Sequence, residues 1–141
     1  MKLQDRVTLV IGGASGIGRA SAEVCAAEGA RVMVADINEE GAKEVAAGIR
    51  AQGGSAAVVM CDITSEDAVR GSVDATAAEF GRLDGLITSP GVGGAPGPGD
   101  RWDRSLEMLL KGPFYACKYA LQQMERDGSG AIVNISSLAG V

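Results

Sequence analysis

The sequence predicts an α/β fold built on a doubly wound parallel sheet. Two observations carry this prediction. Short runs of β-branched and apolar residues alternate with longer segments in which apolar residues recur at helical spacing. Glycines stand at the ends of these segments and do not form a low-complexity run. Strands separated by helices require crossover connections, so we expect about five parallel strands in the order 3-2-1-4-5.

Five segments have the composition of buried strands. The first is the run Val-Thr-Leu-Val-Ile at 7–11, which is followed by two glycines. The other expected strands are 31–35, 56–60, 83–88 and 131–135. Continuous apolar runs of this length are typical of strands that are covered by helices on both faces of a sheet.

Helices are expected between these strands, at 16–28, 39–51, 65–80 and 102–127. Gly29 and Gly81 supply the stops expected after the first and third helices. Thr64 or Ser65 is the expected cap of the third helix, because a short polar side chain can accept a hydrogen bond from the free N–H groups of the first turn.

The last expected helix carries a set of apolar residues on one side. They suit packing in a core or in an interface, and they are Leu106, Leu109, Leu110, Phe114, Cys117, Leu121 and Met124. Pro113 lies inside this helix. It predicts a kink there, because proline has no N–H and its ring crowds the preceding turn.

Length and charge limit the possible organisation and partners. A chain of 141 residues with 46% hydrophobic residues can bury one core, so we expect a single domain over 1–141. The formal net charge of -5 excludes the basic surface that nucleic acid or an anionic membrane would require. The N-terminus runs into the first strand without an apolar leader, which predicts a cytoplasmic protein.

Histidine is absent and the cysteines are scattered. Without histidine the chain lacks the commonest metal ligand and the commonest general base at neutral pH, which excludes zinc hydrolases and Ser-His-Asp triads. Cys25, Cys61 and Cys117 form neither a C-x-x-C pair nor a disulfide-like pattern. We therefore expect small buried thiols in a reducing compartment, and no metal site.

A glycine-rich turn joins the first strand to the first helix. It reads G-G-A-S-G-I-G at 12–18, a G-x-x-x-G-x-G spacing. Small residues here let backbone N–H groups and the positive end of the helix dipole approach a pyrophosphate. The turn therefore predicts a Rossmann-like dinucleotide site, with contacts from Gly12, Ser15, Gly16, Ile17 and Gly18. The alternative is a tight strand-to-helix turn that binds no ligand.

An acidic residue closes the second strand. Asp36 lies 24 residues after Gly12, near the offset at which a carboxylate accepts hydrogen bonds from both ribose hydroxyls of a dinucleotide. A carboxylate there repels a 2′-phosphate, and the glycine turn holds no basic residue to neutralise one. We therefore expect NAD rather than NADP, and we include Ile37 among the cofactor-binding residues. The alternative is that Asp36 only forms a turn or caps the next helix.

These motifs resemble the short-chain dehydrogenase/reductase family, whose fingerprint is T-G-x-x-x-G-x-G. Residues 11–18 match it everywhere except at the threonine, where this chain has Ile11. The resemblance implies an NAD-dependent oxidoreductase that transfers hydride between NAD and a small carbonyl or alcohol substrate. It also implies that Asp62 contacts the adenine amino group and Ile63 the adenine ring. The alternative for Asp62 is an ordinary turn residue.

Three further segments compare with the same family. After the fourth strand the family has N-N-A-G, whereas this chain has T-S-P-G and keeps only Gly91, the glycine that lets the backbone approach the cofactor. The N-I-S-S segment at 134–137 matches, which implies that Ser137 hydrogen-bonds the substrate carbonyl or hydroxyl. Leu109 stands where the family has an asparagine that holds a proton-relay water, and a leucine side chain cannot do so.

The catalytic Y-x-x-x-K pair of the family has no counterpart in this sequence. The tyrosines are Tyr115 and Tyr119, and Lys118 follows Tyr115 by three residues rather than four. A tyrosine near its reference pKa of about 10 is a poor acid-base group at neutral pH without a cationic neighbour. We therefore expect the N-terminal, NAD-binding portion of such an enzyme, an incomplete domain with little activity of its own.

Two other functions stay open. A non-catalytic NAD-binding or oligomer-forming protein would explain Leu109 and the missing tyrosine and lysine. A methyltransferase that uses S-adenosylmethionine shares the glycine turn and the distal acid, but the glycine spacing and the N-I-S-S segment count against it. The family usually forms dimers or tetramers through long helices, which implies a homo-oligomer through 102–127. The strand at 131–135 would leave an open sheet edge that invites self-association.

Overall fold

A computed structural model describes residues 1–91 and 101–137 of the chain. The strands form one parallel sheet in the order β3-β2-β1-β4-β5. They are β1 (Val7–Ile11), β2 (Arg31–Asp36), β3 (Ser55–Met60), β4 (Gly85–Thr88) and β5 (Ala131–Asn134). The Rossmann-like fold and its strand order are therefore confirmed. Residues 92–100, which belong to a glycine- and proline-rich segment after β4, lie outside the described residues.

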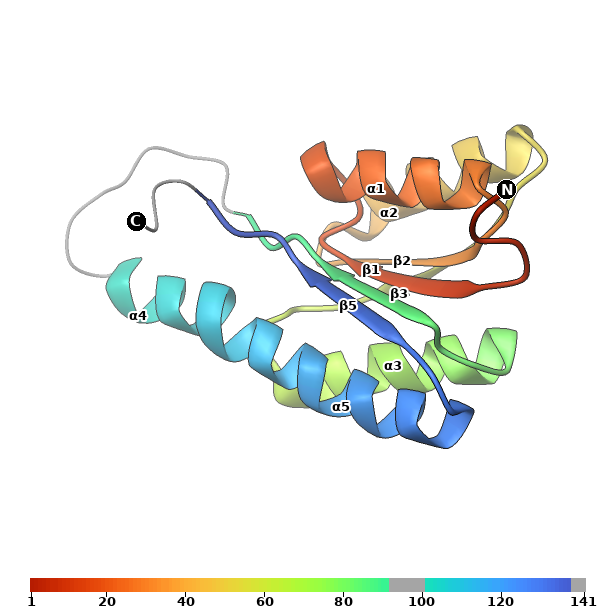
Figure 1. Cartoon of the computed structure of the whole chain (residues 1–141). Helices are drawn as coiled ribbons and strands as arrows, with labels where there is room; N and C mark the ends of the chain where they lie inside the picture. Colours follow the sequence, from red (N-terminus) through yellow and green to blue (C-terminus); the bar gives the residue numbers. More distant parts are fainter. Residues whose placement is uncertain (92–100, 138–141) are drawn as a thin grey trace.

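Helices cover both faces of this sheet. They are α1 (Gly16–Ala27), α2 (Glu39–Ala51), α3 (Glu66–Phe80), and the consecutive segments α4 (Arg101–Leu106), η1 (Glu107–Lys111) and α5 (Gly112–Asp127). Figure 1 shows α1 and α2 on one face of the sheet and α3 and α5 on the other. Among the described helices, none combines the length and the apolar character needed to cross a membrane.

Local sequence signals set the helix ends. The Ser65 hydroxyl accepts a hydrogen bond from the Ala68 N–H at 3.2 Å, so Ser65 rather than Thr64 caps α3. Gly81 ends the same helix with a φ of 83°, a left-handed conformation that glycine adopts without a steric penalty.

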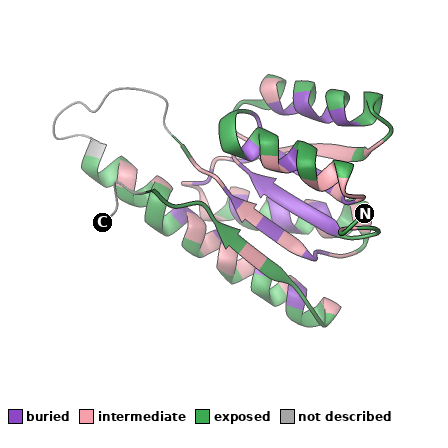
Figure 2. Cartoon of the chain, turned by 45° about the horizontal axis from the view of Figure 1, so that its top comes forward, coloured by how far each residue is buried: buried purple, intermediate pink, exposed green. Residues whose placement is uncertain are grey.

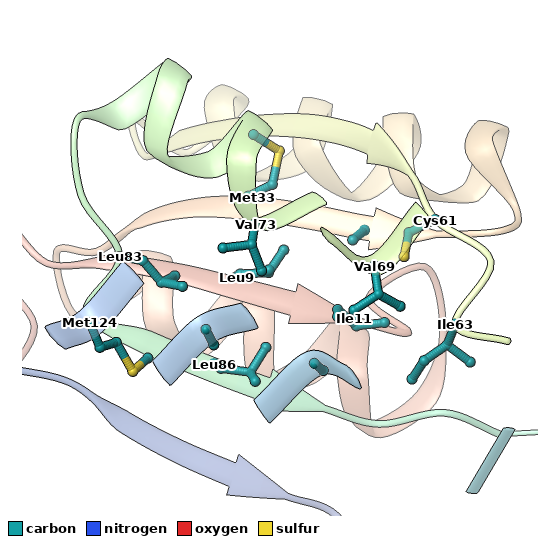
Figure 3. Packing of buried hydrophobic residues seen from close by; sticks show 13 residues of the cluster. Leu9, Ile11, Met33, Cys61, Ile63, Val69, Val73, Leu83, Leu86 and Met124 are labelled. Carbon is teal, nitrogen blue, oxygen red and sulfur yellow. The ribbon is translucent and has the colours of Figure 1, made fainter. Parts of the chain in front are cut away.

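Alternate residues of each central strand face the two helical layers. Leu9 and Ile11 point to the layer of α3 and α5, where they pack with Val69 and Val73 (Figure 3). Val10 points to the opposite layer and joins a second apolar cluster with residues of α1 and α2. Two cores, one on each side of the sheet, therefore hold the molecule together.

The two ends of the strand order differ from the centre in burial. All five residues of β1 are buried, whereas β5 pairs with β4 alone among the described strands and has no buried residue. Figure 2 shows this contrast as a buried strand in the centre of the sheet and a mostly exposed β5 at its edge. The side chain of Val133 is 50% exposed. Among the described residues, the edge of the sheet at β5 is therefore open, as expected.

The long helix is irregular, but not at the expected place. A kink was expected at Pro113, whereas the irregular part is the π-helical segment η1, which ends before Gly112 and Pro113. Pro113 cannot donate to the carbonyl four residues earlier, at Leu109, and its ring crowds that carbonyl. A wider π turn just before the proline accommodates both effects.

Most of the apolar set on this helix faces outward, so of the two expected places, a core or an interface, the core is wrong for most members. The buried face of α5 is instead made of residues spaced by four, namely Gly112, Ala116, Ala120 and Met124. Leu109 is 53% exposed and Phe114 is 62% exposed. The small buried residues let α5 lie close to its neighbours, since a Cβ at Gly112 would stand 2.9 Å from the Ile63 carbonyl oxygen. This close approach turns the larger side chains to the outside.

The cysteines also differ in part from expectation. All three are free thiols, as expected. Cys61 is buried, but Cys25 and Cys117 are only half-buried. Both lie on helices, Cys25 on α1 and Cys117 on α5, at the edge of the buried face.

Candidate functional site

The carboxyl ends of the strands open into one large cavity of about 1680 Å³. Its volume exceeds the roughly 300–1,000 Å³ of ordinary small-ligand pockets. Ten of the eleven site residues expected from the sequence line it, and they are Gly12, Ser15, Gly16, Ile17, Asp36, Ile37, Asp62, Ile63, Gly91 and Ser137. Residues of α4, η1 and the start of α5 form the opposite wall. The fold therefore gathers side chains from six separate segments at one place.

Gly18 is the expected site residue that does not line the cavity, and it has a packing role. A Cβ at Gly18 would overlap the carbonyl oxygen of Gly12. Gly12 in turn has a φ of +84°, and a Cβ there would overlap the carbonyl oxygen of Ser89. These two glycines let the turn, the start of α1 and the end of β4 come into direct contact.

The start of α1 lines the cavity, and within residues 1–91 and 101–137 no backbone hydrogen bond uses its first N–H groups. The first N–H groups of a helix have no acceptor inside the helix, and the Ser15 side chain does not cap them. At Gly16 a Cβ would meet no atom within 4 Å, so this backbone borders open space. Ile17 is 59% exposed beside it. An anionic group can therefore reach the positive end of this helix.

Asp36 stands at the carboxyl end of β2 with both oxygens engaged. Oδ2 accepts a hydrogen bond from the Ala14 N–H and Oδ1 accepts one from the Asn38 N–H, each at 2.9 Å. A carboxylate oxygen has two lone pairs, so each oxygen can accept one more hydrogen bond. The residue is half-buried and lines the cavity, which leaves these lone pairs open to a ligand hydroxyl.

Asp62 and Ile63 form the next part of the wall, after β3. Oδ1 of Asp62 accepts hydrogen bonds from the N–H of Thr64 at 2.9 Å and from its hydroxyl at 2.7 Å. The turn that was the alternative interpretation of Asp62 is therefore present, although the residue also lines the cavity. Ile63 is 7% exposed. Ile37, which follows β2, also lines the cavity and is 63% exposed.

Cys61 lines the cavity, but the environment of its thiol makes the thiol unreactive. Burial raises its pKa to about 11, and a hydrogen bond with Ser72 offsets only part of the effect. The negative charges of Asp62 and Asp36 raise it further. The thiol is therefore protonated at neutral pH, and a protonated thiol is a poor nucleophile.

A hydrogen-bonded chain crosses the other end of the cavity. The buried Thr88 hydroxyl, at the end of β4, donates to Oδ1 of Asn134 at 2.6 Å. Nδ2 of Asn134 donates to Sγ of Cys117 at 3.5 Å. Asn134 and Cys117 line the cavity beside Ser137, and the sequence reasoning assigned neither of them a site role. A signal was available, because Asn134 opens the N-I-S-S segment and Cys117 lies one helical turn after Pro113.

The two tyrosines lie away from the cavity. The Tyr119 hydroxyl donates to Oε1 of Glu66 at 2.7 Å, and Lys118 forms an ion pair with the same oxygen at 2.9 Å. The hydrogen bond from Lys118 and, to a smaller extent, the one from Tyr119 hold the pKa of Glu66 below its usual range. Tyr115 packs against the core beneath the sheet. These residues join α3 to α5, in agreement with a packing role.

Comparisons with known proteins agree on one family. The model of the short chain dehydrogenase family matches residues 6–141. Cis-4-hydroxycyclohexanecarboxylate dehydrogenase of Sinomonas cyclohexanicum is 43% identical over 96% of this chain and 56% of its own. D-threitol dehydrogenase of Mycolicibacterium smegmatis is 40% identical over 98% of this chain and 55% of its own. A solved short-chain type dehydrogenase/reductase of Mycobacterium ulcerans has a TM-score of 0.91 at 35% identity, over 99% of this chain and 54% of its own.

The chain thus spans about half the length of the curated relatives it matches, namely 56% and 55% of the two named above. The match extends over nearly all of this chain and includes the glycine turn, Asp36 and the N-I-S-S segment. It removes the methyltransferase alternative, because the matched family consists of dehydrogenases. With this match, the strand order and the shared fold, the chain belongs to the short-chain dehydrogenase family.

Proposed function

We propose that this chain is the NAD-binding part of an oxidoreductase that transfers hydride between NAD and a small alcohol or carbonyl compound. The observation that carries the proposal is the Asp36 carboxylate, which lines the cavity close to the open start of α1. The names of the relatives support the substrate class, since a hydroxycyclohexanecarboxylate and threitol are both alcohols. A cytoplasmic location belongs to the same proposal, and the three free thiols support it.

The residues of the cavity fit a dinucleotide. The free N–H groups of Gly16 and Ile17 suit the pyrophosphate, and Asp36 suits the hydroxyls of the adenosine ribose. Ile37 and Ile63 both line the cavity, where their apolar side chains suit an adenine ring, and Asp62 is suited to accept a hydrogen bond from its amino group. Gly91 follows β4 and Ser137 follows the neighbouring strand β5, and both line the cavity.

The charges around Asp36 favour NAD over NADP. Arg19 is the first basic residue after the glycine turn, and it is already engaged. Its Nε pairs with Glu23 at 2.9 Å and its Nη1 pairs with Glu44 at 3.4 Å. A 2′-phosphate next to Asp36 would therefore meet a negative charge without a free cation beside it among the described residues.

At the reacting end, this chain contributes a hydroxyl and an apolar wall. When bound, NAD supplies the group that accepts or returns the hydride. The Ser137 hydroxyl is suited to hydrogen-bond the oxygen of the substrate and so to orient it. Leu110 and Phe114 line the same cavity and supply apolar surface there.

Calorimetric titration of the 141-residue chain with NAD and with NADP tests the cofactor proposal. We expect saturable binding of NAD. Binding of NADP should be at least about tenfold weaker, because the repulsion between its 2′-phosphate and the Asp36 carboxylate costs roughly 1.4 kcal/mol or more. Equal binding of the two would contradict the role of Asp36. No saturable binding of either would contradict the cofactor site itself.

Turnover assays with NAD and a panel of alcohols, including threitol and 4-hydroxycyclohexanecarboxylate, test hydride transfer. The appearance of NADH fluorescence with wild-type protein and its loss in Ser137→Ala would support an enzyme. Ser55→Ala is a control on an exposed serine outside the cavity, at the start of β3. Saturable NAD binding without turnover would support the cofactor site but not hydride transfer by this chain, which lacks the Y-x-x-x-K pair.

The second candidate function is a non-catalytic, oligomer-forming NAD-binding protein. The exposed apolar residues of η1 and α5 favour it, since Leu109, Leu110 and Phe114 are each more than half exposed. We expect self-association of the chain on a sizing column, reduced in Phe114→Glu. Val24→Glu is a matched control, because Val24 is 62% exposed on α1, on the opposite face of the sheet. Elution of the wild-type chain as a monomer at every protein concentration tested would contradict the homo-oligomer.

A further inference from the structure

The first three N–H groups of the glycine turn all donate to the end of β2. The N–H groups of Gly12 and Gly13 both donate to the Ala35 carbonyl, at 2.8 and 3.1 Å. The third, that of Ala14, donates to Oδ2 of Asp36 at 2.9 Å. Two of these bonds use a backbone carbonyl, which any residue supplies. The third depends on the side chain at position 36.

Ala14 depends on this carboxylate because it is buried. The residue is 8% exposed, and among the hydrogen bonds of the described residues its N–H has no acceptor other than Asp36. A buried N–H without an acceptor is costly, so the turn would shift to expose or rebond it if the carboxylate were removed. Ser15 and Gly16 follow directly, and they border the place for the pyrophosphate.

The carboxylate is itself held in orientation from the other side. Oδ1 of Asp36 accepts from the Asn38 N–H at 2.9 Å, and the Asn38 side chain caps α2 by accepting from the Gly41 N–H at 3.1 Å. A Cβ at Gly41 would lie 3.1 Å from the Cβ of Ala14. The start of α2 therefore packs on the turn that Asp36 bonds. The turn, the carboxylate and the α2 cap form one closed set of contacts.

We propose that Asp36 is a positioning residue for the glycine turn, in addition to its role toward the ribose. Its carboxylate holds the Ala14 N–H and so keeps the start of α1 in the conformation that receives a pyrophosphate. This inference rests on the proposed function for its ligand. It has a distinct consequence, since loss of the carboxylate weakens a nucleotide even when that nucleotide has no ribose hydroxyls to bind.

Two nucleotides separate the positioning role from the ribose contact. ADP and 2′,3′-dideoxy-ADP are titrated into wild type, Asp36→Ala and Asp36→Asn, with Glu40→Ala as a control of equal charge change on an exposed residue of α2. In Asp36→Ala we expect the dideoxy nucleotide to bind about tenfold more weakly than in wild type. Asp36→Asn keeps one acceptor oxygen, so its affinity for the dideoxy nucleotide should lie between those of wild type and Asp36→Ala. Unchanged binding of the dideoxy nucleotide in Asp36→Ala would overturn the positioning role.

Amide hydrogen exchange of the ligand-free protein tests the same inference without a nucleotide. The Ala14 amide should exchange at least about tenfold faster in Asp36→Ala, because it loses its acceptor. The amide of Leu9 in β1 should keep its protection and so report an intact sheet. Unchanged Ala14 protection would overturn the inference. This readout is independent of NAD, so failure of the proposed function alone would leave Ala14 exchange responsive to Asp36.

Discussion

Two aspartates at opposite ends of the sheet show different uses of a carboxylate. Asp84, just before β4, accepts hydrogen bonds from Arg6 at 3.0 Å, from the Val7 N–H at 2.9 Å and from Nε of Arg82 at 2.8 Å. Its side chain is 7% exposed. Asp36, at the end of β2, is half-buried, accepts two backbone N–H groups and has no ion pair among the described residues.

The difference follows from the direction of a parallel sheet. At the carboxyl ends of the strands the helices begin, so free N–H groups and positive helix ends face the cavity. At the amino ends the helices finish, and the polar groups there bond one another. We infer that the amino end contributes stability and the carboxyl end contributes binding capacity.

The largest expected effect is on the cavity side, at Gly18. In Gly18→Val the new side chain would overlap the Gly12 carbonyl oxygen and displace the turn. We expect NAD affinity to fall by at least about 100-fold and the free energy of unfolding to fall by about 2 kcal/mol. Titration and denaturant unfolding measure the two. Gly48→Val in α2 is the control, because a Cβ at Gly48 meets no atom within 4 Å.

At the other end, Asp84→Asn should reduce stability and leave binding unchanged. It removes the charge that Arg6 and Arg82 bond, and both arginines are partly exposed, so we expect a loss of about 2 kcal/mol rather than the full cost of breaking a buried pair. Denaturant unfolding measures this loss. Asp67→Asn, which removes a surface ion pair with Arg70, should change little. A drop in the NAD affinity of folded Asp84→Asn would contradict the separation.

The same residue predicts a pH dependence of stability. Burial opposes the charge of Asp84, but hydrogen bonds from Arg82, the Val7 N–H and Arg6 outweigh it, so the pKa lies below its usual value. A lowered pKa in the folded state contributes stability that is present above the unfolded pKa and is lost as the pH falls through the folded one. The stability difference between wild type and Asp84→Asn should therefore be constant above about pH 5 and shrink below about pH 4. A constant difference down to acid unfolding would show that the charge of Asp84 is not its source.

The smallest effect concerns the boundary between cavity and core. Cys61 lines the cavity but is 2% exposed, and its pKa is raised to about 11 by burial. In the native protein we expect a thiol reagent to modify half-buried Cys117 and Cys25 before Cys61, with Cys61 reacting only on unfolding. Mass spectrometry of peptides from partly labelled protein measures the order. Rapid native labelling of Cys61 would mean that the cavity extends into the core.

Much of this arrangement could be predicted from the sequence, because local signals and hydrophobic periodicity determine it. The strand runs, Ser65 and Gly81 predicted the ends of the elements to within a residue or two. The glycine turn and Asp36 predicted which residues border the cavity, because the carboxyl ends of parallel strands share one edge. The roles of these residues toward NAD and substrate stay predictions.

Other features depended on contacts that no local pattern reveals. The apolar residues of the long helix gave the correct period, but the small residues at Gly112, Ala116 and Ala120 decided which face is buried. The acceptor of the Ala14 N–H lies 22 residues away in sequence. The bond between Asn134 and Cys117 spans 17 residues and joins a strand to a helix. Such pairs exist only once the layers are packed.

Local chemistry alone therefore decides where the strands, helices and glycine turn of this chain occur, because propensity, caps and periodicity act between near neighbours. Packing decides the rest. Close approach of backbones selects the buried face of α5, and the meeting of β1, β2 and α2 commits the Asp36 carboxylate to Ala14 and Asn38. Both outcomes depend on distances between segments remote in sequence, which are set only when the sheet and its helices assemble.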